Sequence, residues 1–215
     1  MTTPVPSTAF VDLEGVLVPE MWPFLADRFA LPALRETTRE TPDYVALMDK
    51  RIAALRQGGI GIQPILTELR RLAPLPGAID FVRDLKRRGT VVLVSDSFGP
   101  MNSDLVGRFD LDRIICHRFL IDGDGMIAGC DPWNGFRGKH LCYDLFPRSG
   151  GFAFAVGDAL NDVEMLRRAT RGVLFRPSAK TRSSAPDLSV ATEYGELLAA
   201  FDSSYRRHQG GGQEG

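Results

Sequence analysis

The sequence lacks the long apolar segments and the one-sided charge that mark membrane proteins and nucleic-acid-binding proteins. None of its apolar runs approaches the roughly 20 residues that a membrane-spanning helix needs. Its 26 basic side chains are balanced by 27 acidic ones among 215 residues, and the resulting net charge of −1 creates no field that attracts a nucleic acid or an anionic membrane. We therefore expect the partner to be a small molecule.

Cysteine and histidine are also scarce, with three residues of each. The cysteines form no C-x-x-C pair, and their odd number argues against a disulfide framework. Cys116 precedes His117 and Cys142 follows shortly after His140, but this spacing fits no common zinc finger, so ordinary packing or surface positions are favoured. Residues 1–7 lack the basic and apolar regions of a signal peptide, and we expect a cytoplasmic protein.

The sequence does contain enough apolar residues for a sizeable core, at 44% of the chain. Residues 8–18 predict a first strand and its turn, within a first core segment over residues 8–20. Residues 21–73 carry apolar side chains at helical spacing without strand signals, which predicts a small helical insertion. Residues 74–202 alternate helical and strand patterns, as in a parallel sheet with crossover helices. Residues 203–215 offer little to bury, and we expect a disordered tail.

The second part of the chain can be divided further by its periodicity and its turn residues. Helices are expected over residues 78–88, 105–109, 163–169 and 194–201, and buried strands over residues 90–94, 114–116, 152–156 and 172–175. The glycine-rich stretch Asp122-Gly123-Asp124-Gly125 predicts a hairpin turn between two short apolar runs. An Asp-x-Asp-Gly sequence also begins calcium loops, but the bidentate glutamate of an EF-hand is missing, so a plain turn is preferred.

Polar side chains follow three of the buried strands: Asp12, Glu14, Ser95, Asp158, Asn161 and Asp162. Because the carboxyl ends of parallel strands meet at one edge of a sheet, we expect these side chains to lie close together. Asp12 and Glu14 taken alone could be no more than an acidic turn. Four carboxylates in one crevice, however, cannot all stay ionised without a cation.

An oxygen-rich crevice suits Mg²⁺, which keeps several waters and takes one or two carboxylates together with the phosphate of a substrate. Asp12 and Asp158 are the best candidate ligands. A backbone carbonyl near Glu14 is a further candidate, and Asp162 would orient the ligands.

A phosphoryl group in the same crevice needs hydrogen-bond donors. Ser95 offers a hydroxyl, and the amides that follow it are expected in a turn between a strand and a helix, which suits anions. Lys139 lies 19 residues before Asp158 and would complete the charge balance. On its own, Lys139 is better explained as a solvated lysine, and only its combination with the other residues favours a role in the site.

These residues occur in the order and spacing of the four motifs of the haloacid dehalogenase superfamily, which the chain resembles from about Phe10 to Phe201. The motifs are Asp12-Leu13-Glu14-Gly15-Val16, Ser95, Lys139 and Gly157-Asp158-x-x-Asn161-Asp162. The helices after the first motif resemble the small cap of the phosphoserine phosphatase branch. A finer likeness is to the bifunctional phosphoserine phosphatase/homoserine phosphotransferase group, and it rests on residues 12–20, Trp22, Thr37-Thr38-Arg39, Pro42-Asp43-Tyr44 and Met48 to Arg51.

The resemblance implies a Rossmann-like, three-layer α/β/α core with a parallel sheet, a small hairpin and a C1-type helical cap inserted after the first strand. It also implies a phosphatase that depends on Mg²⁺. Asp12 would attack the phosphorus atom to give an aspartyl-phosphate, and Glu14 would protonate the leaving alkoxide and then activate the attacking water. Ser95 and Lys139 would hold the phosphoryl oxygens. The ion would be held by Asp12, the Glu14 carbonyl and Asp158, supported by Asp162.

By the same resemblance, the substrate is a small phosphorylated metabolite such as phosphoserine. Glu20 would receive its ammonium group and Arg51 would pair with its carboxylate. Asp96 and Ser97 replace two glycines of ordinary phosphoserine phosphatases, and we place both in the substrate site with Asn161. The oligomeric state is left open, with a homodimer as the candidate assembly.

Two departures leave alternatives open. Glu14 stands where the superfamily usually has Asp, and residues 133–137 do not follow the bifunctional group. A phosphotransferase that passes the phosphoryl group to homoserine or another alcohol is therefore the main alternative, beside a phosphatase of a different biosynthetic phosphate. A non-catalytic binding protein is disfavoured because every motif residue is present. A dehalogenase is disfavoured because its chemistry needs no magnesium acids such as Asp158 and Asp162.

Overall fold

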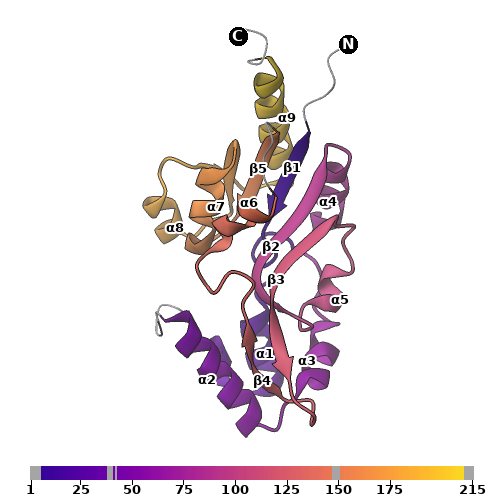
Figure 1. The fold of residues 1–215 in the computed structure, drawn as a ribbon, viewed down its shortest axis with the longest axis vertical. Helices are drawn as coiled ribbons and strands as arrows, with labels where there is room; N and C mark the ends of the chain where they lie inside the picture. Colours follow the sequence, from indigo (N-terminus) through magenta and orange to yellow (C-terminus); the bar gives the residue numbers. More distant parts are fainter. Residues whose placement is uncertain (1–5, 38–40, 42, 147–150, 211–215) are drawn as a thin grey trace.

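A seven-stranded sheet runs through the protein in a computed structural model that describes residues 6–37, 41, 43–146 and 151–210 (Figure 1). The strand order is β4-β3-β2-β1-β5-β6-β7, and every neighbouring pair is parallel except β3 and β4. The strands are β1 (Ser7–Val11), β2 (Thr90–Gly99), β3 (Arg113–Ile121), β4 (Ile127–Asp131), β5 (Phe152–Gly157), β6 (Arg171–Phe175) and β7 (Ser189–Ala191). The expected α/β class with a mostly parallel sheet is confirmed.

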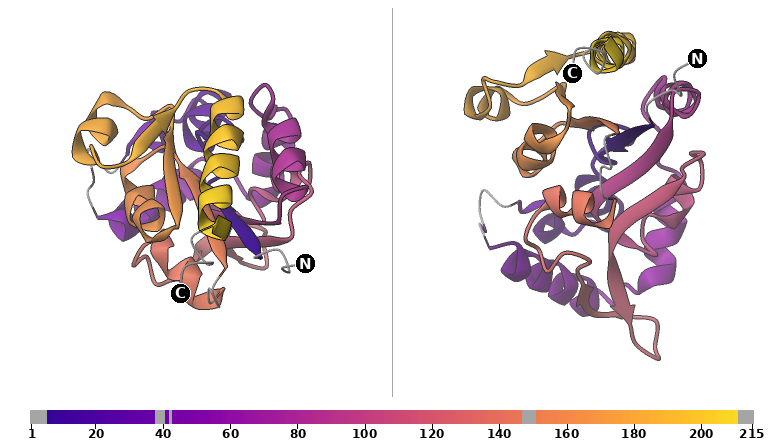
Figure 2. Two further views of the ribbon diagram at one scale, coloured as in Figure 1. Left: turned by 90° about the horizontal axis from the view of Figure 1, so that it is seen from above. Right: turned by 45° about the horizontal axis from the view of Figure 1, so that its top comes forward.

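Helices cover both faces of this sheet. Successive side chains of its central strands point to opposite faces, and because these strands carry apolar side chains on both sides, both faces have to be buried. Ala9 and Val11 of β1 belong to one hydrophobic cluster, whereas Phe10 between them belongs to a second. The first cluster includes residues of α4 (Ala78–Lys86) and α9 (Tyr194–Gly210), and the second includes residues of α6 (Cys142–Leu145) and α7 (Val163–Arg168). Figure 2 shows α4 and α9 side by side, apart from α7. The expected three-layer core is therefore present.

The chain between β1 and α4 is helical, as its apolar spacing predicts. It contains α1 (Met21–Phe29), the 3₁₀ helix η1 (Pro32–Arg35), α2 (Tyr44–Gln57) and α3 (Ile62–Leu69), which we call the helical segment. This segment lies at the end of the molecule away from both termini (Figure 1), where α2 packs against β4. The Trp22 and Phe119 rings meet edge to face, with centroids 6.4 Å apart. The division into a core (8–20 and 74–202) and a cap (21–73) stays a prediction.

Strand β2 is longer than the sequence predicts. Its apolar run ends at Val94, but the strand continues to Gly99, and its register with β3 shifts between Val94 and Phe98. Ser95 and the two residues after it therefore form a bulge inside a strand. The expected turn between a strand and a helix directly after Ser95 is wrong, because α5 begins only at Ser103 (Ser103–Val106).

Strand β3 and the C-terminal helix also correct the sequence-based boundaries. One continuous strand replaces the short strand and hairpin arm expected between Ile114 and Ile121. Helix α9 extends to Gly210, so the disorder expected from Ser203 onward is wrong up to that residue. The Tyr205 ring lies 5.4 Å from Phe152, and this packing explains the extra turns. The rest of the expected tail, residues 211–215, lies outside the described residues.

Two short elements were not expected at all, namely α8 (Ala179–Ser184) and β7. Helix α8 is largely polar and β7 has only three residues, so neither carries a helical or strand periodicity. None of the described helices has the length and apolar character needed to cross a membrane.

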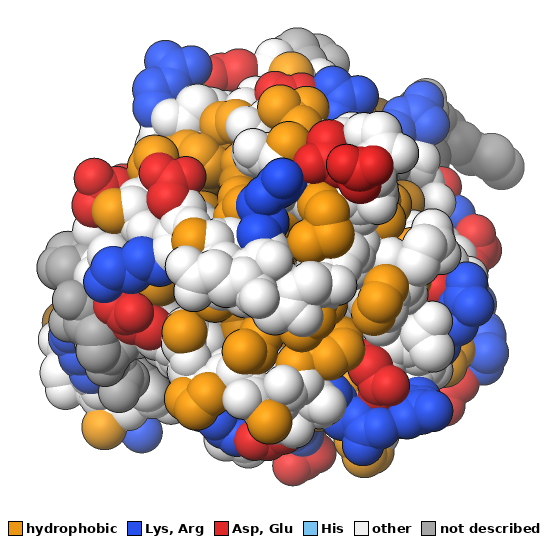
Figure 3. Space-filling view, turned by 90° about the horizontal axis from the view of Figure 1, so that it is seen from below, with side chains coloured by type: hydrophobic (Ala, Val, Ile, Leu, Met, Phe, Trp, Pro, Cys, Tyr) orange, Lys and Arg blue, Asp and Glu red, His pale blue; other side chains and the backbone are white. Residues whose placement is uncertain are grey.

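Figure 3 looks onto the end of the molecule that carries the helical segment, and hydrophobic side chains there lie interspersed with charged ones. Val45 of α2 and Leu120 of β3 are exposed apolar side chains. The candidate homodimer stays a prediction.

Candidate active site

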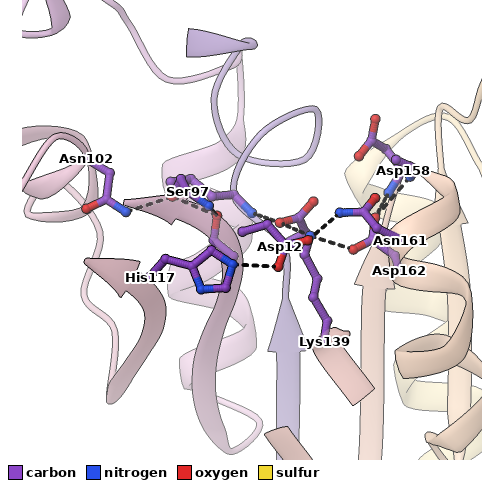
Figure 4. Close-up of polar contacts among 12 residues, drawn as sticks. Asp12, Ser97, Asn102, His117, Lys139, Asp158, Asn161 and Asp162 are labelled. Carbon is purple, nitrogen blue, oxygen red and sulfur yellow. Dashed lines mark hydrogen bonds and ion pairs between the residues drawn. The ribbon is translucent and has the colours of Figure 1, made fainter. Parts of the chain in front are cut away.

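Asp12 directly follows the central strand β1 and occupies the middle of the carboxyl edge of the sheet. Its backbone amide donates to the Val156 carbonyl at 3.0 Å, which holds the residue in line with the strand. Only 4% of Asp12 is exposed. Figure 4 shows Asp12 with His117 and Ser97 on one side and with Asp158, Asn161 and Asp162 on the other. The strand order β2-β1-β5 thus brings the expected side chains together.

Lys139 is buried within this cluster and forms ion pairs with two of its acids. Its Nζ atom lies 2.7 Å from Asp12 Oδ1 and 2.7 Å from Asp162 Oδ1 (Figure 4). The chain reaches it through Gly138, which has a φ of 116°, and enters the 3₁₀ helix η2 (Lys139–Leu141). Burial lowers the pKa of the ammonium group, but Asp12 and Asp162 outweigh burial and hold that pKa well above its ordinary value. Lys139 is therefore a fixed positive charge and not a solvated lysine.

Three acids face this one lysine. Asp12, Asp158 and Asp162 each bring a carboxylate oxygen within 4.8 Å of the others, in the only such grouping with metal-ligand spacing within residues 6–37, 41, 43–146 and 151–210. Burial and then repulsion from Asp162 raise the pKa of Asp12 well above its ordinary value, and the same two causes raise the pKa of Asp158 to about 7. A divalent cation would offset this excess of negative charge, and carboxylate oxygens are the ligands that Mg²⁺ prefers.

Two glycines leave room for these acids. A Cβ atom on Gly15, which has a φ of 75°, would lie 2.4 Å from Asp158 Oδ2. A Cβ atom on Gly157 would lie 2.3 Å from Asp162 Cγ. Asp162 is further fixed by the amides of Asp158 and Ala159, which both donate to its Oδ2 at 3.0 Å in the 3₁₀ helix η3 (Leu160–Asp162). The close approach of the acids is thus built into the backbone.

Glu14 follows Asp12 by two residues and turns its side chain toward the start of α1. Its Oε1 accepts a hydrogen bond from the Met21 amide at 2.6 Å. Burial, and after it repulsion from Glu20, raises the pKa of Glu14 to about 8. A carboxyl with this pKa is largely protonated at neutral pH, which is the form that donates a proton.

A cavity of about 710 Å³ opens over this cluster. Nine predicted site residues line it: Asp12, Glu14, Glu20, Arg51, Ser95, Asp96, Lys139, Asp158 and Asn161. Asp162 lies behind this wall, bonded to Lys139. The cavity joins the carboxyl edge of the sheet to α1 and α2 of the helical segment, so both parts of the chain shape it.

Ser97 is the predicted substrate residue that does not reach the cavity wall. Its side chain is buried, and its Oγ accepts hydrogen bonds from Ser95 Oγ at 2.8 Å and from Asn102 Nδ2 at 2.7 Å (Figure 4). The reason is the bulge in β2, which sends Ser95 and Ser97 into mutual contact. Ser97 therefore orients the Ser95 hydroxyl from behind.

A family model described as haloacid dehalogenase-like hydrolase matches residues 7–167. The chain belongs to this family. The resemblance carried by the four motifs is confirmed, and the hydrolase motifs are the residues that surround the cavity.

Two relatives of this hydrolase match it over most of their length. One is the phosphoserine phosphatase ThrH of Pseudomonas aeruginosa, 33% identical over 198 residues that cover 90% of this chain and 94% of the relative. The other is a phosphoserine phosphatase of Pseudomonas syringae pv. tomato, 32% identical over 200 residues that cover 90% of this chain and 81% of the relative. With the family match, they make the hydrolase a phosphatase that takes a small phosphorylated substrate.

Solved structures agree on the fold. A substrate-bound phosphoserine phosphatase complex superposes with a TM-score of 0.76 at 17% identity, covering 93% of this chain and 99% of the other. A phospho-aspartyl intermediate analogue of phosphoserine phosphatase superposes with a TM-score of 0.75 at 18% identity, covering 91% of this chain and 98% of the other.

Some residues that line the cavity of the hydrolase were not predicted from the sequence to belong to the site. They are Trp22, Pro23, Arg35, Thr37, Tyr44, Leu47, Ala159, Leu160, Ser178, Lys180 and Thr181. Trp22 and Tyr44 carried a signal, because both belong to the residues that resemble the bifunctional group. Lys180 carried none, since α8 has no apolar periodicity. The motif positions Thr38, Arg39 and Pro42 lie outside the described residues.

Proposed function

We propose that the protein is a Mg²⁺-dependent phosphatase that hydrolyses phosphoserine, or a similar small amino-acid phosphate, through an aspartyl-phosphate on Asp12. The observation that carries this proposal is that one cavity contains both the acid cluster around Asp12 and the buried Arg51. The first suits a phosphoryl group with a cation, and the second suits a carboxylate. A substrate with a phosphate and a carboxylate a few atoms apart fits both.

Arg51 supports the proposal because it lies buried without an acidic partner. Its Nη2 donates to the Glu36 carbonyl at 2.8 Å, its guanidinium stacks 4.5 Å from the centroid of Trp22, and 6% of the residue is exposed. Its buried Nε has no hydrogen-bond partner among the described residues. An unpaired buried charge is costly, and a substrate carboxylate would supply the missing partner in a fork-to-fork pair.

The proposed first step is attack by Asp12 on the phosphorus atom. Asp12 Oδ1 is held by Lys139 and by the Leu13 amide at 2.7 Å each, which leaves Oδ2 without a hydrogen bond among the described residues. Oδ2 is therefore the proposed nucleophile. The proposed donors to the phosphoryl oxygens, whose charge grows in the transition state, are the Lys139 ammonium and the Ser95 hydroxyl, which would turn from Ser97 Oγ toward the phosphoryl group.

Glu14 is the proposed acid and base. Its protonated carboxyl would give its proton to the leaving alkoxide of the substrate, which frees the alcohol and leaves Asp12 phosphorylated. The resulting carboxylate would then take a proton from water, which attacks the phosphorus atom and restores Asp12. The raised pKa of Glu14 supports the first of these roles.

Mg²⁺ would be held by Asp12, Asp158 and the Glu14 carbonyl, with Asp162 fixing the arrangement from behind. When bound, the ion would neutralise charge on the phosphoryl oxygens. The three-acid grouping, the raised pKa values of Asp12 and Asp158 and the space left by Gly15 support this assignment. At the other end of the cavity, Glu20 is the proposed acceptor for an ammonium group.

The test is an assay for inorganic phosphate over a panel of phosphorylated amino acids, sugars and biosynthetic intermediates. We expect phosphoserine to be among the best substrates, release to stop with EDTA and return with Mg²⁺, and Asp12→Asn to be inactive. Phosphate release that survives both EDTA and Asp12→Asn would overturn the proposal. Adding homoserine to the same assay and following its phosphorylation tests the phosphotransfer alternative.

A further inference from the structure

A hydrogen bond crosses the carboxyl edge of the sheet at Asp12. Asp96, in the bulge of β2, accepts from Asn161 Nδ2 at its Oδ2, 2.7 Å away. Asn161 follows β5, and β1 lies between β2 and β5 in the sheet. The bond therefore joins the two sides of the cavity across the strand that carries the proposed nucleophile. Asp96 and Asn161 both line the cavity.

This bond fixes which end of the Asn161 amide faces the cavity. A carboxylate can only accept, so the Nδ2 group must point at Asp96 and the carbonyl oxygen must point away from it. Asp96 is a carboxylate at neutral pH. Burial would raise the pKa of Asp96, but Lys139, His117 and Asn161 outweigh burial and lower that pKa to about 2.

His117 holds the other oxygen of the same carboxylate. Its Nε2 lies 3.4 Å from Asp96 Oδ1 (Figure 4). The ring is 1% exposed and packs between Phe98 and Phe136, with centroids 5.2 and 4.9 Å away. Its Nδ1 has no hydrogen-bond partner among the described residues, so Asp96 is the single polar contact of a buried imidazole. A buried polar ring with one partner points to a role for that contact.

Lys139 competes with His117 for the Asp96 carboxylate. Lys139 attracts the Asp96 carboxylate, and this attraction is among the causes that shift the pKa of both groups. If Asp96 moved toward Lys139, it would weaken the ion pair of Lys139 with Asp12 and release Asn161. His117 and Asn161 hold the two oxygens of Asp96 and so keep the carboxylate away from the lysine.

We propose that His117 is a positioning residue that acts through Asp96 to hold Asn161 and Lys139 in place at the phosphoryl end of the cavity. The inference rests on the proposed phosphatase function. It gives Asp96, a negative charge near an anionic substrate, a structural reason to be there.

The test is a double-mutant cycle on kcat and KM with the best phosphomonoester of the panel. His117→Phe keeps a ring among the aromatic neighbours but removes the donor, and His117→Gln keeps a donor near the position of Nε2. We expect His117→Phe to lower kcat by roughly tenfold, in the range of small misplacements of reacting groups, with KM changed less than threefold. His117→Gln should recover most of the loss. In an Asp96→Asn background, His117→Phe should cost less than about twofold more, because its path is already broken.

Thermal unfolding of each variant separates positioning from folding. Losses that multiply in the double variant, an unchanged kcat for His117→Phe, or equal losses for Phe and Gln that follow the drop in melting temperature would each overturn the inference. In those cases wild-type activity shows that the proposed function still holds. If the wild-type protein releases phosphate from no monoester, the proposed function fails and the inference fails with it.

Discussion

At the scale of single residues, the site depends on an imbalance of buried charge. Lys139 is a single cation between Asp12 and Asp162, while Asp158 and Glu14 lie next to them with raised pKa values. At the other end of the cavity, Arg51 is a buried cation that makes no ion pair with any acid of the described residues. Mg²⁺ would offset the acids at one end so that the phosphoryl group can bind there, and the substrate carboxylate would pair with Arg51 at the other.

Arg51 provides the first prediction. Arg51→Met should raise KM for phosphoserine by at least tenfold, since loss of one partner of a desolvated charge pair costs about 2–5 kcal/mol. KM for p-nitrophenyl phosphate, which has no carboxylate, should change less than about twofold. Arg56→Met is the matched control, because Arg56 lies on the same helix but is exposed and paired with Asp122. Equal losses on both substrates would reject a carboxylate role for Arg51.

Glu14 provides the second prediction. Glu14→Gln should lower kcat for phosphoserine by about 10²–10⁴-fold, the usual contribution of a general acid or base. With p-nitrophenyl phosphate, whose leaving group needs little protonation, the enzyme should still be phosphorylated but should turn over slowly. A rapid-mixing experiment should therefore show a burst of one p-nitrophenolate per enzyme. If the steady-state rate instead stays at the wild-type value, Glu14 is not the base.

At the scale of elements, close backbone contacts hold the acids in place. Gly157 ends β5 and is not in the left-handed region, so the cost of a side chain there would come from crowding, and the nearest atoms belong to Asp162. Gly157→Ala should weaken Mg²⁺ activation by at least tenfold and lower the melting temperature by several degrees, as overpacking of a core does. Gly123→Ala, at a site with no atom within 4 Å of the new Cβ, should change neither. Similar melting curves and Mg²⁺ titrations for both variants would contradict this account.

The elements also show what the sequence could and could not predict. The strands that end at Asp12 and Asp158 are continuous apolar runs, and their periodicity predicted both the sheet and the acids at its edge. Strand β2 was harder, because the polar bulge at Ser95 interrupts its apolar pattern while the backbone pairing resumes at Phe98. Helix α9 was underestimated because its last turns pack only part of their surface, through Tyr205.

The same reasons explain the site residues that were missed or misplaced. Ser97 was expected in the cavity, but the direction of a side chain in a bulge cannot be inferred from alternation along a strand. The contact of His117 with Asp96 joins two strands whose register is set by that bulge. Lys180 lies on a helix without periodicity. These features depend on tertiary packing, and no local pattern encodes them.

At the scale of the whole molecule, the raised pKa values couple stability to pH. Folding raises the pKa of Glu14 from 4.5 to about 8 and the pKa of Asp158 from 3.8 to about 7. Between the lower and the upper pKa of each group, the folded protein therefore binds more protons than the unfolded chain. Stability from these groups is therefore present at low pH and is lost as the pH rises through about 7 to 8. In EDTA, the melting temperature should fall between pH 6 and pH 8.5.

Mg²⁺ should reverse much of this loss, because an ion bound to the carboxylates favours their charged form and stabilises the folded state. The increase in melting temperature at 10 mM Mg²⁺ should accordingly be larger at pH 8.5 than at pH 6. Differential scanning calorimetry at both pH values measures it, and Asp158→Asn is the control that should lose most of the increase. A melting temperature that rises with pH in EDTA would contradict the assigned direction of the pKa shifts.

The most direct test of the central claim is to locate the phosphoryl group on the enzyme. Wild-type protein mixed with phosphoserine and Mg²⁺, quenched in acid and reduced with borohydride should yield homoserine in place of aspartate at position 12, because borohydride reduces an acyl phosphate to an alcohol. Mass spectrometry of the peptide that contains Phe10 to Glu20 detects the change. We expect it in the wild type and not in Asp12→Asn or without substrate. Reduction at another carboxylate, or rapid turnover with Asp12 unmodified, would contradict the account.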